Sequence, residues 1–169
     1  NENLTKTFRY ILPLIKDVPD LGVDLSKFTA DAVKNMSAED MVVVDLEGNV
    51  VEGSLRPSSD TPTHLEIYKS FEGVGAVVHT HSTYATAWSQ ACRSIPNLGT
   101  THSDTFHHAI PCTGEMTKEQ IDRAYEKETG VVIAESFRTI NPMHTPAVLV
   151  AHHGPFAWGE SAKKAVENA

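Results

Sequence analysis

Six of the nine histidines occur in close pairs, and this clustering is the first sign of chemistry in the sequence. His79 and His81 are separated by one residue at the end of a valine-rich run, and His152 and His153 directly follow a second apolar run. Residues i and i+2 of a strand project to the same face, so His79 and His81 would present two imidazoles side by side. Catalytic zinc takes three protein ligands and keeps one position open. We therefore expect His79, His81 and His153 to bind a divalent metal.

Two histidines at a strand end can also be exposed to solvent without binding a metal. The predicted metal site forms only if the two apolar strands end near each other. On a strand, His152 would point away from His153, so only one of the two is expected to be a ligand. Asp60 could add a carboxylate, as a ligand or as a base. The other histidines are expected to be structural, exposed or placed around the metal site: His64, His102, His107, His108 and His144.

Other polar residues have both a chemical and a structural interpretation. Asp104 lies in a polar segment and could be a general acid/base, although aspartate is equally common in turns. Ser58 and Ser59 precede a predicted helix, where free N–H groups favour a phosphate, but the same residues also serve as simple helix caps. Cys92 is expected on a helix face, and Cys112 has no predicted partner.

Composition excludes several classes of protein. The chain has 169 residues, of which 40% are hydrophobic, enough for a buried core. Its 22 acidic and 14 basic residues give a formal net charge of -8, which disfavours binding to nucleic acid or to an anionic membrane. Two cysteines supply no disulfide framework, and the sequence has neither a signal peptide nor an apolar run of about 18 residues. We therefore expect a cytoplasmic protein.

The hydrophobic pattern predicts alternating strands and helices, which favours an α/β fold with helices covering a sheet. A hairpin is expected over 41–52, with its turn at Glu47-Gly48-Asn49. Thr117 and Gln120 form a capping box, and Gly130 is expected to interrupt the helix that follows. Buried strands are expected over 74–80 and 147–151, and helices over 25–36, 63–71, 84–92, 117–137 and 161–169.

Six motifs together carry a resemblance to a known family. They are RPSSDTPTH (56–64), VHTHS (78–82), GTTHSD (99–104), IPCT (110–113), YEKETG (125–130) and HGPFAWG (153–159). Over about residues 35–169, the chain resembles the L-ribulose-5-phosphate 4-epimerases of the class II aldolase/epimerase superfamily. The TTHSD and IPCT segments favour the epimerases over the fuculose- and rhamnulose-phosphate aldolases.

The resemblance implies a three-layer α/β fold, in which a central, largely antiparallel sheet is flanked by helices. It also implies a homotetramer. The activity implied is a zinc-dependent epimerisation between L-ribulose 5-phosphate and D-xylulose 5-phosphate, by retro-aldol cleavage and re-formation of the C3–C4 bond. Two alternatives stay open. One is a class II aldolase that cleaves a related ketose phosphate, and the other is a non-catalytic metal-binding paralogue or fragment.

The resemblance also implies a role for individual residues. His79, His81 and His153 would hold one zinc ion per subunit, with Asp60 beside it, although three histidines also suit Mn²⁺ or Co²⁺. The residues implied to be catalytic are Asp104 and Glu126, and those implied to bind substrate are Ser58, Ser59 and Thr100.

The same resemblance divides the chain into two stretches. Residues 41–169 are family-like, whereas residues 1–40 lack the family's two phosphate-gripping loops. The family's second acid/base, a tyrosine near the C-terminus, would lie beyond residue 169. We therefore expect one class II aldolase/epimerase-like domain over 1–169, incomplete at both ends.

Overall fold

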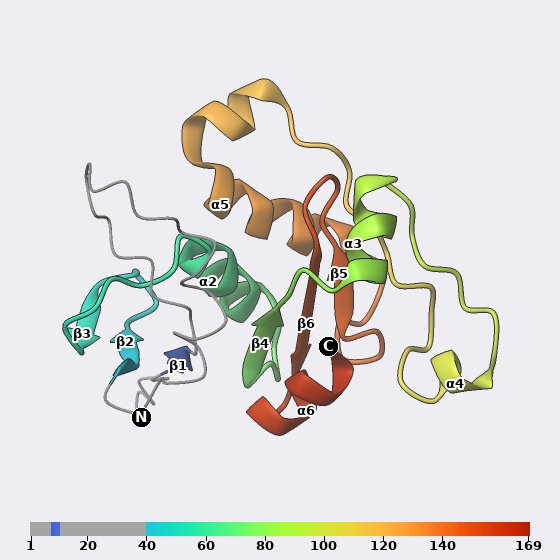
Figure 1. The fold of residues 1–169 in the computed structure, drawn as a ribbon, viewed down its shortest axis with the longest axis horizontal. Coiled ribbons are helices and arrows are strands. Elements are labelled where there is room, and N and C mark those ends of the chain that lie inside the picture. The colour runs from blue at the N-terminus through green and yellow to red at the C-terminus, as the bar shows by residue number, and fades with distance from the viewer. Residues whose placement is uncertain (1–7, 11–39) are drawn as a thin grey trace. The chain divides into compact units, whose positions relative to one another are not determined.

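The computed structural model describes residues 8–10 and 40–169, and it contains two compact units, residues 1–61 and 62–169 (Figure 1). The predicted helix over 25–36 lies outside the described residues. Within the described ranges, none of the helices combines the length and apolarity that crossing a membrane requires.

The first unit contains a three-stranded antiparallel sheet in the order β1-β2-β3. Its strands are β1 (Phe8–Tyr10), β2 (Val42–Val44) and β3 (Val50–Glu52). The predicted hairpin over 41–52 is confirmed, because β2 and β3 pair directly. The Asp45 carboxylate closes the turn by accepting hydrogen bonds from the Asn49 side chain and from the backbone N–H groups of residues 47 and 49.

The second unit contains another three-stranded antiparallel sheet, in the order β4-β6-β5. Its strands are β4 (Ala76–His79), β5 (Ala147–Leu149) and β6 (Pro155–Gly159). The predicted antiparallel character is confirmed, but the described strands form two small sheets. The central strand β6 escaped prediction because it begins at Pro155 and ends at Gly159, residues that normally argue against a strand. Proline is tolerated here because it is the first residue of the strand.

The predicted helices over 63–71, 84–92, 117–137 and 161–169 are confirmed with small shifts at their ends. The Thr117–Gln120 capping box is present as expected. Residues 100–103 form a short helix, which the polar composition of this segment did not predict. The helices are α2 (Thr61–Ser70), α3 (Thr83–Gln90), α4 (Thr100–Ser103), α5 (Lys118–Ser136) and α6 (Ala162–Asn168).

The core of the second unit is built around the central strand β6. Phe156 and Trp158, on the same face of this strand, are fully buried. Helix α6 packs against β6 and β4, and α3 packs against β5 and β6. The indole N–H of Trp158 donates to the carbonyl of Pro142 at 2.9 Å, so the ring is buried with its polar atom satisfied. The remaining buried members of this cluster are Ile67, Phe71, Val74, Val77, Ile133, Phe137, Val148 and Val150.

Helix α5 continues through Gly130, so the predicted interruption there is wrong. The irregular backbone lies instead at Ala124, with φ -169° and ψ 72°. At Gly130, α5 packs closely against α2. A Cβ atom at this position would lie 2.4 Å from the Cβ of Glu66 and 3.1 Å from the carbonyl oxygen of Thr63. The glycine therefore serves close helix packing and does not end the helix.

We expect Gly130→Ala to lower the free energy of unfolding by about 1–3 kcal/mol, because the added methyl group overpacks the α2–α5 contact. This loss should appear although alanine gains about 1 kcal/mol over glycine in a helix. Urea unfolding of the purified protein measures the change. Gly114→Ala is the matched control, because a Cβ there would meet nothing within 4 Å. Equal stability of the two variants would contradict this packing role.

Candidate metal centre

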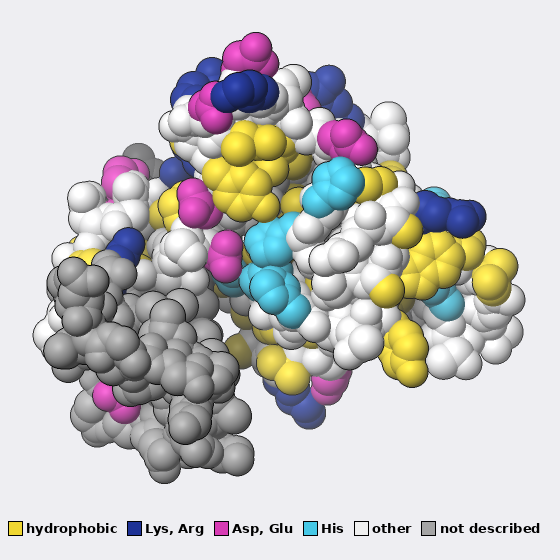
Figure 2. All heavy atoms as spheres, turned by 45° about the horizontal axis from the view of Figure 1, so that its top comes forward, with side chains coloured by type: hydrophobic (Ala, Val, Ile, Leu, Met, Phe, Trp, Pro, Cys, Tyr) yellow, Lys and Arg dark blue, Asp and Glu magenta, His cyan; other side chains and the backbone are white. Residues whose placement is uncertain are grey.

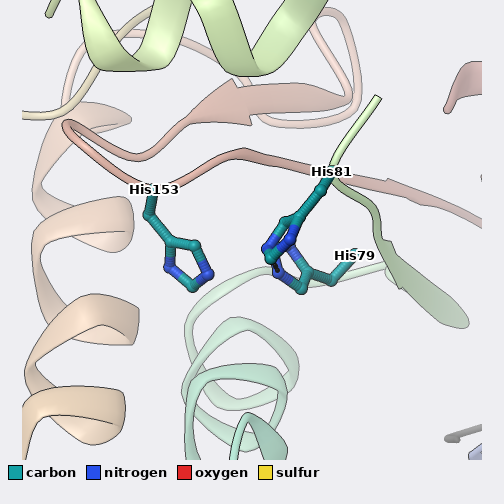
Figure 3. A group of neighbouring side chains, drawn as sticks. All are labelled: His79, His81 and His153. Atoms are coloured by element: carbon teal, nitrogen blue, oxygen red, sulfur yellow. Dashed lines mark hydrogen bonds between the residues drawn. The ribbon is translucent and has the colours of Figure 1, made fainter. Parts of the chain in front are cut away.

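The structure brings His79, His81 and His153 together in the second unit (Figure 3). His79 is the last residue of β4, His81 follows two residues later, and His153 lies in the turn between β5 and β6. One ring nitrogen from each histidine lies within 4.8 Å of the other two. The Nε2 atoms of His79 and His81 are 3.1 Å apart. His79 and His153 are half-buried and His81 is exposed. Figure 2 shows histidine side chains gathered at the surface on one face of the molecule.

Pairing between β4 and β6 orients the His79 ring. His79 pairs with Phe156 in the sheet, and its Nδ1 donates to the carbonyl of Pro155 at 2.9 Å. With the proton on Nδ1, the lone pair of Nε2 faces His81. Gly154 makes room for this arrangement, because a Cβ there would lie 3.1 Å from Cδ2 of His81 and 3.6 Å from Cε1 of His79.

Tyr125 contacts the third histidine, and sequence reasoning missed it. Its hydroxyl on α5 lies 3.4 Å from Nδ1 of His153. Tyr125 belongs to the YEKETG motif, in which the resemblance implies a role only for its neighbour, Glu126. Contact between a helix and a turn 28 residues away is a tertiary feature that residue spacing does not encode.

Aromatic packing supports the histidine group from the core side. The Phe156 ring stacks on His79, with ring centroids 4.1 Å apart and planes 18° from parallel. His64, on α2, packs edge-on against the Phe156 ring, with centroids 5.6 Å apart. Burial, with a smaller contribution from the charge of His79, lowers the pKa of His64 to about 3. His64 is therefore neutral and buried on a helix, in agreement with the structural role expected for it.

The donor set fits a divalent transition metal. Two nitrogens on a tetrahedral zinc ion, at about 2.0–2.1 Å from the metal, lie about 3.3 Å apart. The 3.1 Å between His79 and His81 is close to this value. A carbonyl partner on the second ring nitrogen, as Pro155 supplies to His79, is what metal-ligating histidines usually have. Three histidines leave a fourth position open.

Ser58, Ser59 and Asp60 belong to the first unit, where they form the turn that precedes α2. The Ser58 hydroxyl accepts a hydrogen bond from the backbone N–H of Asp60 at 3.1 Å. Ser58 and Asp60 are half-buried, and Ser59 is exposed. Their expected roles in phosphate and metal binding stay predictions.

The remaining predicted residues lie on, or directly after, two helices of the second unit. Thr100 begins α4, and Asp104 follows its last residue, donating its backbone N–H to the Thr100 carbonyl at 2.8 Å. Both side chains are exposed. Glu126 is half-buried on α5, beside Tyr125, and neither it nor Asp104 belongs to the histidine group. Their catalytic roles also stay predictions.

Two expectations about neighbouring residues need correction. His152 does not belong to the histidine group, as expected. The expected cause, that it points away from His153 on a strand, is wrong, because His152 lies in a turn. Its backbone has φ +63°. Cys92 does not lie on a helix face, because α3 ends at Gln90, and its sulfur lies 3.4 Å from Nε2 of His152.

Comparison with known proteins identifies relatives of the chain. The model of the family "Class II Aldolase and Adducin N-terminal domain" matches residues 27–169.

Among solved structures, the chain is similar to an L-fuculose 1-phosphate aldolase, with 27% identity and a TM-score of 0.68 over 81% of this chain and 59% of the other. It is also similar to YgbL from Escherichia coli, a candidate aldolase/epimerase/decarboxylase, with 25% identity and a TM-score of 0.60 over 83% and 64% of the two chains. A third relative is the L-fuculose-1-phosphate aldolase from Thermus thermophilus, with 25% identity and a TM-score of 0.59 over 81% and 64%. The chain spans less than two thirds of the length of each of these proteins.

Proposed function

Because this chain belongs to the class II aldolase and adducin N-terminal domain family, we propose that it is a zinc-dependent sugar-phosphate epimerase, interconverting L-ribulose 5-phosphate and D-xylulose 5-phosphate. The observation that carries this proposal is the group of three histidines, His79, His81 and His153, whose ligand nitrogens converge within 4.8 Å. A divalent metal bound there supplies a Lewis acid for carbonyl and hydroxyl oxygens of the substrate. Pentose catabolism is the proposed setting, and a cytoplasmic homotetramer with the family's three-layer fold is the proposed form.

The protein's own residues orient the ligands and handle protons in this proposal. Pro155 fixes the His79 ring through its carbonyl, and Tyr125 holds the orientation of His153. Breaking the C3–C4 bond requires a base to take the proton of the C4 hydroxyl. Re-forming the bond on the other face of the aldehyde requires an acid to return a proton, so two groups are needed. We propose Asp104 as one of them.

The roles proposed for the other site residues rest on the motifs in which these residues occur. Glu126 follows Tyr125 in the YEKETG motif and is proposed as a catalytic residue. Asp60 is proposed beside the metal. The residues proposed to bind substrate are Ser58, Ser59 and Thr100. Support for the epimerase comes from the TTHSD and IPCT motifs, the first of which forms α4 and the residue after it.

A second candidate function is a class II aldolase that cleaves a related ketose phosphate. It is favoured by the similarity to an L-fuculose 1-phosphate aldolase, with a TM-score of 0.68. An aldolase would release dihydroxyacetone phosphate and an aldehyde, whereas the epimerase retains both fragments until the bond is re-formed.

Product analysis on the zinc-loaded chain tests the proposal. With L-ribulose 5-phosphate as substrate, we expect D-xylulose 5-phosphate as the product, detected by a coupled assay and by chromatography. Release of dihydroxyacetone phosphate from a related ketose phosphate, without epimerisation, would favour the aldolase. One zinc ion bound at the histidine group, with no reaction of any sugar phosphate, would overturn both enzymatic proposals and favour a non-catalytic metal-binding protein.

A further inference from the structure

A second group of metal-binding side chains lies in the same unit, formed by Cys92, Glu115 and His152. We propose that this group is a second site for a divalent cation, with zinc as the fitting metal and a thiolate as one of its ligands. The sulfur, one carboxylate oxygen and one ring nitrogen all lie within 4.8 Å of one another. The three residues come from different places: the end of α3, the segment before α5 and the turn after β5.

The backbone holds two of these residues in an unusual conformation. Cys92 has φ +51° and His152 has φ +63°, and in the described part of the chain they are the only residues other than glycine with positive φ. A side chain in this left-handed region costs free energy. Two such positions meeting at one cluster therefore point to function more strongly than either would alone.

One carbonyl oxygen fixes the position of both strained residues. The backbone N–H groups of Cys92 and His152 both donate to the carbonyl of Ser89, each at 3.0 Å. Ser89 is fully buried at the end of α3. The end of α3 and the turn after β5 are thereby held at one point, which brings the thiol and the imidazole together before any ligand binds.

Two of the three distances between the ligand atoms are close to those around a tetrahedral cation. Nε2 of His152 lies 3.4 Å from Sγ of Cys92 and 3.4 Å from Oε1 of Glu115. With a zinc–sulfur distance of about 2.3 Å and zinc–nitrogen and zinc–oxygen distances of about 2.1 Å, these edges would be about 3.6 Å and about 3.4 Å. The sulfur also lies 3.6 Å from Nδ1, so it approaches the ring between the two nitrogens, and binding a cation through Nε2 requires the exposed His152 ring to turn toward the sulfur.

The donor set selects the metal and separates this site from the histidine group. Thiolate and imidazole ligands favour zinc over magnesium or calcium, and zinc binding releases the thiol proton. The side chains of His152 and Glu115 are 62% and 70% exposed, so a cation can enter from solvent and its fourth position stays open. The first group contains three imidazoles and no sulfur, so spectroscopy can distinguish the two sites.

Cobalt binding to the metal-free chain tests this proposal, because Co²⁺ replaces zinc and its thiolate complexes absorb in the near ultraviolet. We expect two Co²⁺ ions per chain and a thiolate-to-cobalt charge-transfer band. Cys92→Gly should bind one ion and lose the band, and glycine keeps the positive φ without strain, so this variant should fold. His152→Asn should behave in the same way.

Two further variants make the result specific. His79→Gln removes a residue of the first group, so it should keep the thiolate band although it binds one ion fewer. Cys112→Ser should keep both ions and the band. The proposal is overturned if the band survives in Cys92→Gly, if the unaltered chain gives no band, or if saturation needs millimolar cobalt, which would indicate an adventitious ion only. None of these readouts depends on turnover of a sugar phosphate.

Discussion

Replacing His81 with alanine is expected to remove the metal from the histidine group and to reduce sugar-phosphate turnover to background. The substitution leaves two imidazoles, His79 and His153, where a catalytic zinc ion normally has three protein ligands. Replacing a residue that only hydrogen-bonds to a ligand typically weakens metal binding about 10–100-fold. Loss of a ligand itself should therefore weaken binding by more than about 100-fold.

His81 suits this test because its side chain is exposed and follows the end of β4. A substitution at such a position should change the free energy of unfolding by no more than about 0.5 kcal/mol. His144→Ala is the matched control, since His144 is also exposed and belongs to neither metal group. Metal content by elemental analysis, turnover by product detection and stability by urea unfolding are measured on both variants. Retention of zinc at this group and of full turnover in His81→Ala would contradict the assigned ligand set.

The histidine group could be predicted because its information is mostly local. The spacing of His79 and His81 brings the two rings together at the end of β4, and an apolar run followed by His153 marks the return of the chain. Hydrophobic runs and capping residues predicted the helices for the same reason. The Thr117–Gln120 capping box, for example, involves residues only three positions apart.

The features that could not be predicted depend on contacts between distant segments. Gly130 looks like a helix breaker until its neighbour on α2, Glu66, is known. Strand β6 owes its place to pairing on both edges, with β4 and with β5. Tyr125 meets His153, and Cys92 meets His152, only after the sheet and helices have packed. Residue type and spacing carry no signal for these pairs.

Phe156→Ala is expected to destabilise the fold and weaken metal binding at the same time. Phe156 is fully buried on the central strand, and its ring stacks on His79 at 4.1 Å between centroids. Truncation of a buried phenylalanine typically costs about 3–5 kcal/mol, because it removes apolar burial and leaves a cavity. It would also free the His79 ring on one face, so we expect metal affinity to fall about 10–100-fold, as for other partners of metal ligands.

Phe137→Ala separates the two effects, because Phe137 belongs to the same core cluster and meets Phe71 and Trp158 but none of the three histidines. It should lose a similar free energy of unfolding and keep its metal affinity, measured by competition with a zinc chelator under conditions where both variants are folded. If the alanine variants do not fold, Phe156→Leu and Phe137→Leu allow the same comparison with a smaller loss of stability. Equal metal affinities in the two variants would mean that the hydrogen bond from His79 to Pro155 orients the ligand without help from the stacked ring. A selective loss in the Phe156 variant would mean that core packing holds the ligand in place, so that stability and metal binding depend on the same aromatic side chain.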